Sequence, residues 1–391
     1  MNIKDNSWVL LIFAGAAALA LGMGIGRFAY TPILPFMIEE LGLTAADGGL
    51  IASWNFVGYC VGSLLPIFSV FARNLKSWFF CSVFLSIIST AAMGLVTDLN
   101  WFILIRILSG ISSAFILIFG TSLILPSVQE LGRVSTSTTH LMGVGIGIVL
   151  SSIAVSVMGH LGFLWDELLF GTALLALFLA IPVFILTPAD SRKKEGNTRK
   201  TTSGYNMGFI LITMGYGLFG FGYVILATFV STMARTVSEL SSTEPYIWLL
   251  VGLAGIPSVI IWPWLGRIIG NDRALALACT FEAIGVFVSA AETSQLGIIV
   301  GSIILGATFM GITALAFLEG QNRFNGPVIA STAILTSSFS LGQVLGPYSA
   351  GLIIHATGNF HTVMSVSTAA LVIAAFLMLD PKRIISLTRT R

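Results

Sequence analysis

A permanent cation stands deep inside the first apolar stretch of the chain. The residues from Trp8 to Gly26 include no acid and no base, so Arg27 follows a run long enough to form most of a membrane helix. A charge at membrane depth costs about 2.5–3.5 kcal/mol on insertion scales, and residues kept there generally have a function. The guanidinium is a planar fork of donors that matches a carboxylate or a phosphate. We therefore predict that Arg27 binds an anionic group.

Arg106 is the second cation inside an apolar stretch, which runs from Trp101 to Pro126. It could bind the same anion, or it could bond backbone carbonyls of neighbouring helices. A further set of polar side chains lies at similar depth and could contact a bound solute. This set consists of Tyr30, Asn55, Tyr216, Tyr223 and Gln343.

Spacing relates some of these residues to one another. Tyr30 is three residues after Arg27 and should share its helical face. Tyr216 and Tyr223 should form a stripe on one helix, although such aromatic stripes often serve packing instead of binding. Each of the two amides must bond a neighbouring helix or a solute, because an unpaired polar group in the bilayer costs several kcal/mol. For all of them, a binding role and a structural role stay open.

Two titratable side chains are candidates for carrying a proton. Glu282 is the one clear acid inside an apolar stretch, and His140 stands at the start of another. Ionisable residues inside membrane segments often belong to proton relays. The alternative for each is a hydrogen bond that serves the fold.

Pro32 and Pro35 follow Arg27 closely. A proline inside a helix removes a hydrogen bond and clashes with the preceding turn. We expect the two prolines to bend the outer half of the first helix, where a bend could help a gate to close. A static kink that serves packing is the alternative.

The composition indicates a protein that lives in a lipid bilayer. Of the 391 residues, 56% are hydrophobic and 9% are charged, with a mean hydropathy of +0.96, whereas soluble domains carry about 25% charged residues. The net charge is +2 and the basic residues are dispersed, which does not favour binding to nucleic acid. Cys60, Cys81 and Cys279 lie far apart inside apolar runs, a pattern typical of neither a disulfide framework nor a metal site.

Twelve apolar stretches are long enough to cross a bilayer, which takes about 20 residues. They are Trp8–Ile38, Gly48–Phe71, Trp78–Val96, Trp101–Pro126, Thr138–Met158, Leu168–Leu186, Met207–Met233, Tyr246–Ile269, Ala274–Ala291, Leu296–Leu318, Val328–His355 and Val363–Leu379.

Basic residues between these stretches fall almost entirely on one side. Of the 19 Lys and Arg residues, Arg27 and Arg106 are interior and Arg235 alone follows an odd-numbered stretch, which leaves 19 − 3 = 16 on the side of the termini. Cytoplasmic loops are enriched in Lys and Arg. We therefore expect both termini in the cytoplasm and the chain in the bacterial cytoplasmic (inner) membrane.

The chain reads as a duplication. The polar residues 187–204 are expected to form a cytoplasmic linker between one domain at 1–186 and another at 205–391. Gly24, Gly26 and Gly110 recur 196 positions later, as Gly220, Gly222 and Gly306, and the sequence WNFVG at 54–58 is answered by WLLVG at 248–252. These repeats predict an all-α membrane protein with twelve transmembrane helices in two pseudo-symmetric six-helix bundles.

This plan resembles the major facilitator superfamily over the whole chain. The segment LIRILSGISSAF (104–115) resembles the superfamily's fourth-helix motif, and GVGIGIVLS (143–151) and GQVLGPYSAG (342–351) resemble its glycine-rich motif in helices five and eleven. The segments GIGRFAYTPILPFM (24–37) and HLMGVGIGIVLS (140–151) look most like the YbfB/YjiJ-type branch. The loop FSVFARNLKSW (68–78) departs from the family, because it lacks the Gly and the Asp of the usual charge latch.

The resemblance implies that helices one, four, seven and ten line a central cavity, which would place Arg27 and Arg106 beside the solute. Two acid–base pairs at cytoplasmic loops look like gate ion pairs, and we expect them between Glu319 and Arg323 and, at the equivalent loop, between Glu130 and Arg133.

We therefore expect a secondary active transporter that moves a small polar, carboxylate-bearing anion by alternating access with proton coupling. We expect it to work as a monomer among lipids, without a cofactor, and no Walker motif indicates ATP as the driver. The alternative within the superfamily is a drug or metabolite efflux pump. An intramembrane enzyme or a receptor without flux fits less well, because the interior acids and histidines are isolated on different helices.

Overall fold

The computed structural model describes residues 7–72, 74–133, 136–187, 206–236, 244–291, 295–357 and 360–379, and every regular element within these ranges is a helix. The all-α prediction is confirmed for this part of the chain. Eleven spans within it are long and apolar enough to cross a membrane. The remaining expected span is α11 (Asn271–Ala291), whose 21 residues include Asp272, Arg273 and Glu282. Of the expected linker, only Thr187 lies within the described residues.

The chain divides into two compact units. Unit 1 comprises Met1–Gly196 and Pro245–Ile256, and unit 2 comprises Asn197–Glu244 and Pro257–Arg391. The N-terminal half of α10 (Glu244–Ile269) thus packs with unit 1. Glycines permit this packing, because a Cβ added to Gly145 would lie 2.8 Å from the carbonyl oxygen of Gly252.

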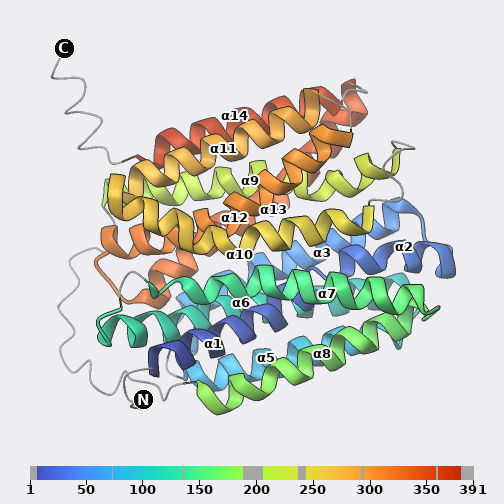
Figure 1. The fold of residues 1–391 in the computed structure, drawn as a ribbon, viewed down its shortest axis with the longest axis horizontal. Helices are drawn as coiled ribbons and strands as arrows, with labels where there is room; N and C mark the ends of the chain where they lie inside the picture. The colour runs from blue at the N-terminus through green and yellow to red at the C-terminus, as the bar shows by residue number, and fades with distance from the viewer. Residues whose placement is uncertain are drawn as a thin grey trace. The chain divides into compact units, whose positions relative to one another are not determined.

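Unit 1 begins with an interrupted first helix. The interruption separates α1 from α2 and consists of a π-helical segment, Ala20–Ile25, and a turn over residues 26–29. We call residues 20–29 the helix-one break. The helices of unit 1, shown in blue and green in Figure 1, are α1 (Ser7–Leu19), α2 (Tyr30–Leu41), α3 (Ala45–Leu64), α4 (Ser69–Ala72), α5 (Leu75–Met93), α6 (Leu99–Glu130), α7 (Met142–His160) and α8 (Trp165–Leu186). Two short 3-10 segments, Leu65–Ile67 and Thr139–Leu141, complete it.

Small residues bring the helices of unit 1 into backbone contact. A Cβ on Gly110 of α6 would collide with the backbone of Asn55 and Tyr59 in α3, and one on Gly147 of α7 would collide with the backbone of Ala20. Close packing of this kind through glycine is characteristic of membrane helices, since their association depends on van der Waals contact. It fixes α3 and α7 against the two helices that carry the buried arginines.

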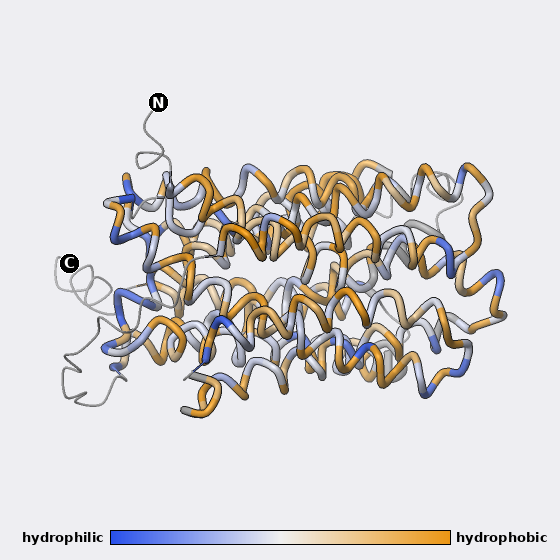
Figure 2. The backbone as a smooth tube through the Cα atoms, turned by 90° about the horizontal axis from the view of Figure 1, so that it is seen from below, coloured by the Kyte–Doolittle hydropathy of each residue, from blue (hydrophilic) through white to orange (hydrophobic). Residues whose placement is uncertain are grey.

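Unit 2 is built around a continuous helix, α9 (Met207–Thr236). It also contains the second half of α10, α11, α12 (Gln295–Arg323), α13 (Val328–Thr357) and α14 (Phe360–Met378). Helices α9, α11 and α14 lie together in Figure 1, and glycines again mediate contact, since a Cβ on Gly342 of α13 would collide with the backbone of Gly217 in α9. Hydrophobic residues run along the helices, and most hydrophilic residues lie toward their ends (Figure 2).

Candidate functional site

The helix-one break changes the hydrogen bonding of the backbone just before and after Arg27. The N–H of Gly26 donates to Leu21 O at 2.9 Å and that of Phe28 to Met23 O at 3.1 Å, which are bonds of π-helical spacing. The break lies before the two prolines and not at them. Pro32 is in the first turn of α2, where its missing N–H is tolerated, and its ring excludes the carbonyl four residues earlier from an α-helical position.

Arg106 on α6 binds the carbonyls of this break. Its Nη1 donates to Gly26 O at 3.4 Å and its Nη2 to Arg27 O at 3.3 Å, while Ser109 Oγ also donates to Gly26 O at 2.7 Å. The side chain is only 4% exposed, and its guanidinium carbon is 4.6 Å from the centre of the Tyr30 ring. Of the two roles open to Arg106, this geometry favours the bonding of carbonyls on a neighbouring helix.

Tyr30 and Asn55 complete the frame around Arg106. The Tyr30 hydroxyl donates to Gly48 O at 2.9 Å and so joins α2 to α3. The Asn55 amide donates to Arg106 O at 3.1 Å and to Ser109 Oγ at 3.4 Å, which joins α3 to α6. Tyr30, which was expected to share a helical face with Arg27, also lies against the other arginine.

Arg27 lies among aromatic rings. Its guanidinium carbon is 4.2 Å from the ring centre of Tyr59, 4.9 Å from that of Phe56 and 5.4 Å from that of Phe28, and the residue is 3% exposed. Rings attract a cation electrostatically and more strongly where water is excluded. These rings hold the guanidinium in place within unit 1.

Trp248 of α10 adjoins one of these rings, that of Phe28. It stacks on Phe28 with ring centres 5.6 Å apart, and both residues belong to unit 1. Sequence reasoning missed Trp248, Phe28, Phe56 and Tyr59 as neighbours of Arg27. A partial signal was present, since Phe56 and Tyr59 share a helix face at a spacing of three and Trp248 begins the second copy of the repeated WNFVG segment.

The candidate residues of unit 2 form a separate stack of rings. Tyr216 and Tyr223 of α9 lie 4.8 and 5.4 Å from the ring of Phe339, with interplanar angles of 18° and 12°. The Tyr216 hydroxyl donates to Thr313 Oγ1 at 3.0 Å, and Gln343 Nε2 donates to the Tyr223 hydroxyl. These contacts join α9 to α12 and α13, so the packing role described for the stripe accounts for them.

The two proton candidates have different surroundings. His140 is fully buried, with Nδ1 2.9 Å from Ser137 O and Nε2 3.2 Å from Thr121 Oγ1, so both ring nitrogens serve the fold. Glu282 of α11 is 1% exposed and accepts a hydrogen bond from Thr308 through Oε2. Its Oε1 has no hydrogen-bond partner within the described residues.

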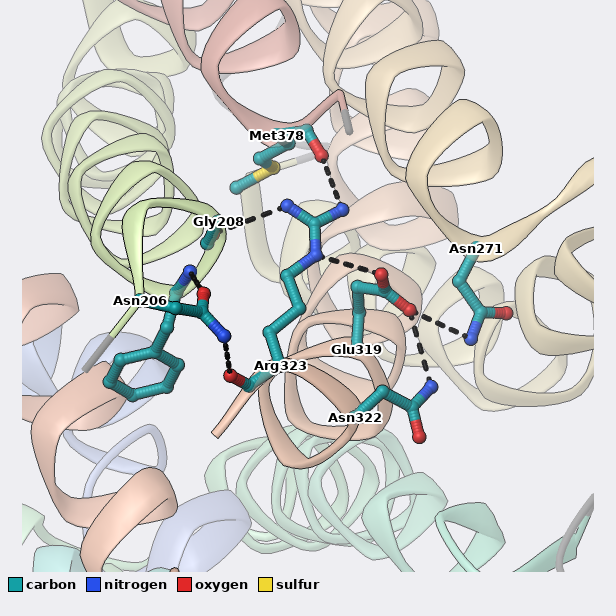
Figure 3. A network of polar contacts seen from close by, with 8 residues as sticks. Asn206, Gly208, Asn271, Glu319, Asn322, Arg323 and Met378 are labelled. Carbon is teal, nitrogen blue, oxygen red and sulfur yellow. Dashed lines mark hydrogen bonds and ion pairs between the residues drawn. The ribbon is translucent and has the colours of Figure 1, made fainter. Parts of the chain in front are cut away.

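Glu319 and Arg323 form the centre of a polar cluster at the end of α12 (Figure 3). Arg323 Nε is 2.8 Å from Glu319 Oε1, and the two terminal nitrogens of Arg323 donate to Gly208 O and Met378 O, each at 3.2 Å. Asn271 Nδ2 donates to Glu319 Oε2 at 3.3 Å. We call these residues the Arg323 cluster. It ties α12 to α9, α14 and α11 inside unit 2.

The equivalent pair in unit 1 does not form in the described part of the chain. Arg133 is 5.1 Å from the ring centre of Trp8, and no ion pair joins it to Glu130 within the described residues. Helix α6 ends at Glu130, and Gly132 then takes a φ of 75°, which turns the chain before Arg133. The expected ion pair is therefore replaced by a contact between a cation and a ring.

Comparison with known proteins covers most of the chain. A family model described as the uncharacterised MFS-type transporter YbfB matches residues 19–379. The comparison with curated proteins gave no match. The matched residues include both buried arginines, the rings around Arg27 and the Arg323 cluster.

Proposed function

Because this chain belongs to the MFS-type transporter family described as YbfB and is a multi-pass membrane protein, we propose that it is a secondary active transporter of a small polar, carboxylate-bearing anion. Arg27 carries the proposal. It is a buried, permanently charged donor fork held by rings, and an anion would offset the cost of its burial. A carboxylate can take two parallel hydrogen bonds from such a fork.

Alternating access is supported by the contrast in stiffness between helices. The helix-one break has hydrogen bonds of π-helical spacing on both sides of Arg27, and π-bulges are among the points where helices bend. In unit 2 the Arg323 cluster holds four helix ends together. We infer that α1 and α2 change their angle at the break while the helix ends of unit 2 move as one body.

Proton coupling is assigned to Glu282. A carboxyl group in an apolar setting with one hydrogen-bonded oxygen can exchange a proton without breaking other contacts. The orientation in this proposal has both termini in the cytoplasm of a bacterial cell, because the basic residues outside the membrane gather on that side.

The test is transport by the purified protein in liposomes. A thermal-shift screen against metabolites and drugs selects ligands, and each ligand is then tested in counterflow and in uptake driven by a pH gradient. We expect carboxylates to raise the melting temperature and to exchange, with no effect of ATP. Stabilisation and transport of cationic drugs alone would contradict the proposal and favour the efflux pump.

A variant separates coupling from binding. Glu282→Gln keeps an oxygen that can accept the hydrogen bond from Thr308. Its amide, unlike the carboxyl group, cannot bind and release a proton. We expect it to keep counterflow and to lose accumulation driven by a pH gradient. Accumulation at the wild-type level would remove Glu282 from the coupling mechanism and leave anion transport untouched.

A further inference from the structure

A buried hydroxyl in unit 2 has more acceptors around it than hydrogens to donate. Thr308 Oγ1 on α12 lies 2.6 Å from Ile304 O and 3.2 Å from Leu305 O, and it also contacts Glu282 Oε2 of α11. A threonine hydroxyl carries one hydrogen and two acceptor lone pairs. It can donate to the backbone of its own helix or to Glu282, so hydrogen bonds in both directions require a second hydrogen.

A protonated Glu282 supplies that hydrogen. A neutral carboxyl group has one O–H donor, and an O–H on Oε2 would donate to Thr308 Oγ1 while Thr308 donates to Ile304 O. Oε1 of Glu282 has no hydrogen-bond partner within the described residues. In the ionised form this oxygen would share the negative charge without a donor, which costs more than burying a neutral carbonyl oxygen. The contacts of both oxygens therefore favour the neutral acid.

No basic side chain offsets an ionised Glu282. The residue is 1% exposed, and no ion pair joins it to a basic residue in the described part of the chain. The thiol of Cys279, one turn earlier on α11, interacts with it electrostatically but supplies no positive charge. The other described titratable groups on α11 and on the helices packed against it form no hydrogen bond or ion pair with Glu282; they are Asp272, Arg273, Tyr216, Tyr223, Arg267, Glu319, Arg323 and His361.

Close packing of α11 against α12 keeps the acid and the hydroxyl in contact. A Cβ on Gly285 would lie 2.6 Å from the Ile304 side chain, and one on Gly301 would collide with Ser289 Oγ. Ile304 O lies inside α12, where it keeps its backbone hydrogen bond when the hydroxyl turns away. A change in the protonation of Glu282 can therefore be accommodated by rotation of one hydroxyl, without movement of either helix.

We propose that Thr308 positions the coupling proton and that the structure shows Glu282 in its neutral form. In this form Glu282 donates to Thr308, and Thr308 donates to Ile304 O. On release, the Oε2–H bond breaks, the proton passes to a water molecule, and the Thr308 hydrogen turns to the carboxylate. The inference rests on the proposed proton coupling by Glu282 and adds the residue that holds both forms of the acid.

Infrared spectroscopy of the purified full-length protein in liposomes tests the protonation of Glu282, with the proton itself as the ligand. A neutral carboxyl group gives a C=O stretching band that moves when D2O replaces water. The difference between the wild type and Glu282→Gln assigns the band of this one residue. We expect the Glu282 band at neutral pH. Its absence there would show that the acid is ionised and would overturn the inference.

Substitutions on α12 test the role of the hydroxyl. Thr308→Val keeps the shape and Thr308→Ala removes bulk as well, and in both the Glu282 band should shift to higher wavenumber because the acid has lost its acceptor. Thr308→Ser restores the hydroxyl and should restore the band position. Ser302→Ala is the control, because Ser302 is also buried on α12 but donates to Ile298 O, at 2.7 Å, and not to Glu282. Melting temperatures show that each variant is folded.

Transport by the same variants separates this inference from the proposed function. If Glu282→Gln loses accumulation driven by a pH gradient but the band does not shift in Thr308→Val or Thr308→Ala, the coupling assignment stands and the role of Thr308 is wrong. If the band shifts but Glu282→Gln accumulates at the wild-type level, Thr308 holds the acid and the proposed coupling is overturned. A shifted band together with lost accumulation supports both.

Discussion

Tyr223 is the residue of unit 2 that corresponds to Arg27 of unit 1 in the sequence repeat, because Gly222 corresponds to Gly26 at the same offset. The two positions are built differently. Arg27 lies in the helix-one break, whereas Tyr223 lies inside α9, a continuous helix of 30 residues. Rings surround a cation at the first position and stack on one another at the second. The comparison teaches that the duplicated helix plan is shared by the two units while the chemistry at equivalent positions is not.

The difference also involves the backbone. Beside Arg27, the carbonyls of Gly26 and Arg27 accept hydrogen bonds from Arg106. Arg106 thus supports the backbone that carries Arg27, the proposed ligand-binding residue. At Tyr223 the side chain itself is bonded, since Gln343 donates to its hydroxyl. Unit 1 therefore concentrates charge at its interrupted helix, and unit 2 provides a ring-packed, continuous helix.

Removal of the Arg27 charge, which distinguishes unit 1 from unit 2, is expected to have the largest effect. Arg27→Ala should weaken carboxylate binding by at least about 30-fold, because loss of one partner of a buried charged pair costs about 2–5 kcal/mol. Arg27→Lys keeps the charge but loses the fork and should weaken binding by about tenfold. Binding and counterflow are measured on protein whose melting curve shows that it is folded. Normal transport by both variants would make Arg27 structural.

The second expected effect concerns Arg106, which supports the backbone of the helix-one break and is not expected to contact the ligand. Arg106→Gln loses the charge-assisted bonds to the carbonyls of Gly26 and Arg27, each worth about 1.5–3 kcal/mol. We expect a drop of about 3 kcal/mol in the free energy of unfolding, with little change in the affinity of the molecules that remain folded. Denaturation in detergent and ligand titration give the two quantities. An unchanged unfolding free energy together with lost binding would reassign Arg106 to the ligand.

Glycine substitutions test the part of the plan that the units share. Gly147→Ala in unit 1 and Gly342→Ala in unit 2 each place a Cβ against the backbone of a neighbouring helix, and each should cost about 1–3 kcal/mol of stability. Gly49→Ala is the matched control, because no atom lies within 4 Å of its added Cβ in α3. It should be neutral or should gain up to about 1 kcal/mol. Equal melting temperatures for all three variants would contradict close packing at these glycines.

The smallest effect is expected at the counterpart of Arg27. Tyr223→Phe keeps the stacked rings and removes the hydroxyl to which Gln343 donates, so it should cost about 1 kcal/mol of stability. The affinity for carboxylates should not change, as a titration on the folded variant would check. A marked loss of affinity would bring Tyr223 back as a ligand-binding residue.

Features that depend on composition and local pattern could be predicted from the sequence. Apolar stretches of sufficient length located the helices, and the isolated charges of Arg27 and Arg106 stood out against them. Even there, α11 has only a modest apolar character, because three charged residues share one helix. The pattern of residue types therefore predicts which segments enter the bilayer. It also predicts which charged side chains cost free energy there.

Contacts between distant segments could not be predicted in the same way. Arg106 bonds the backbone beside Arg27 because α6 packs against helix one. The two bonded residues, Arg106 and Gly26, are 80 positions apart in the sequence. Spacing predicted that Tyr30 lies beside Arg27, but it could not predict the contact of the Tyr30 ring with Arg106. Likewise, the pairing of Arg133 with Trp8 instead of Glu130 follows from a glycine turn at the end of α6. There, one local change of backbone geometry decides which side chains meet.

The π-helical segment has a consequence for the direction in which Arg27 points. Each residue of an α-helix rotates the chain by about 100°, and a π-helical turn holds one residue more than an α-helical turn. Residues beyond Ala20–Ile25 are therefore rotated about the helix axis relative to their positions in an uninterrupted α1. The direction in which Arg27 points around the helix axis therefore depends on residues that precede it in the chain. A deletion of one residue within Ala20–Ile25 would turn the guanidinium of Arg27 toward different side chains. None of the residues that contact it now would have been substituted.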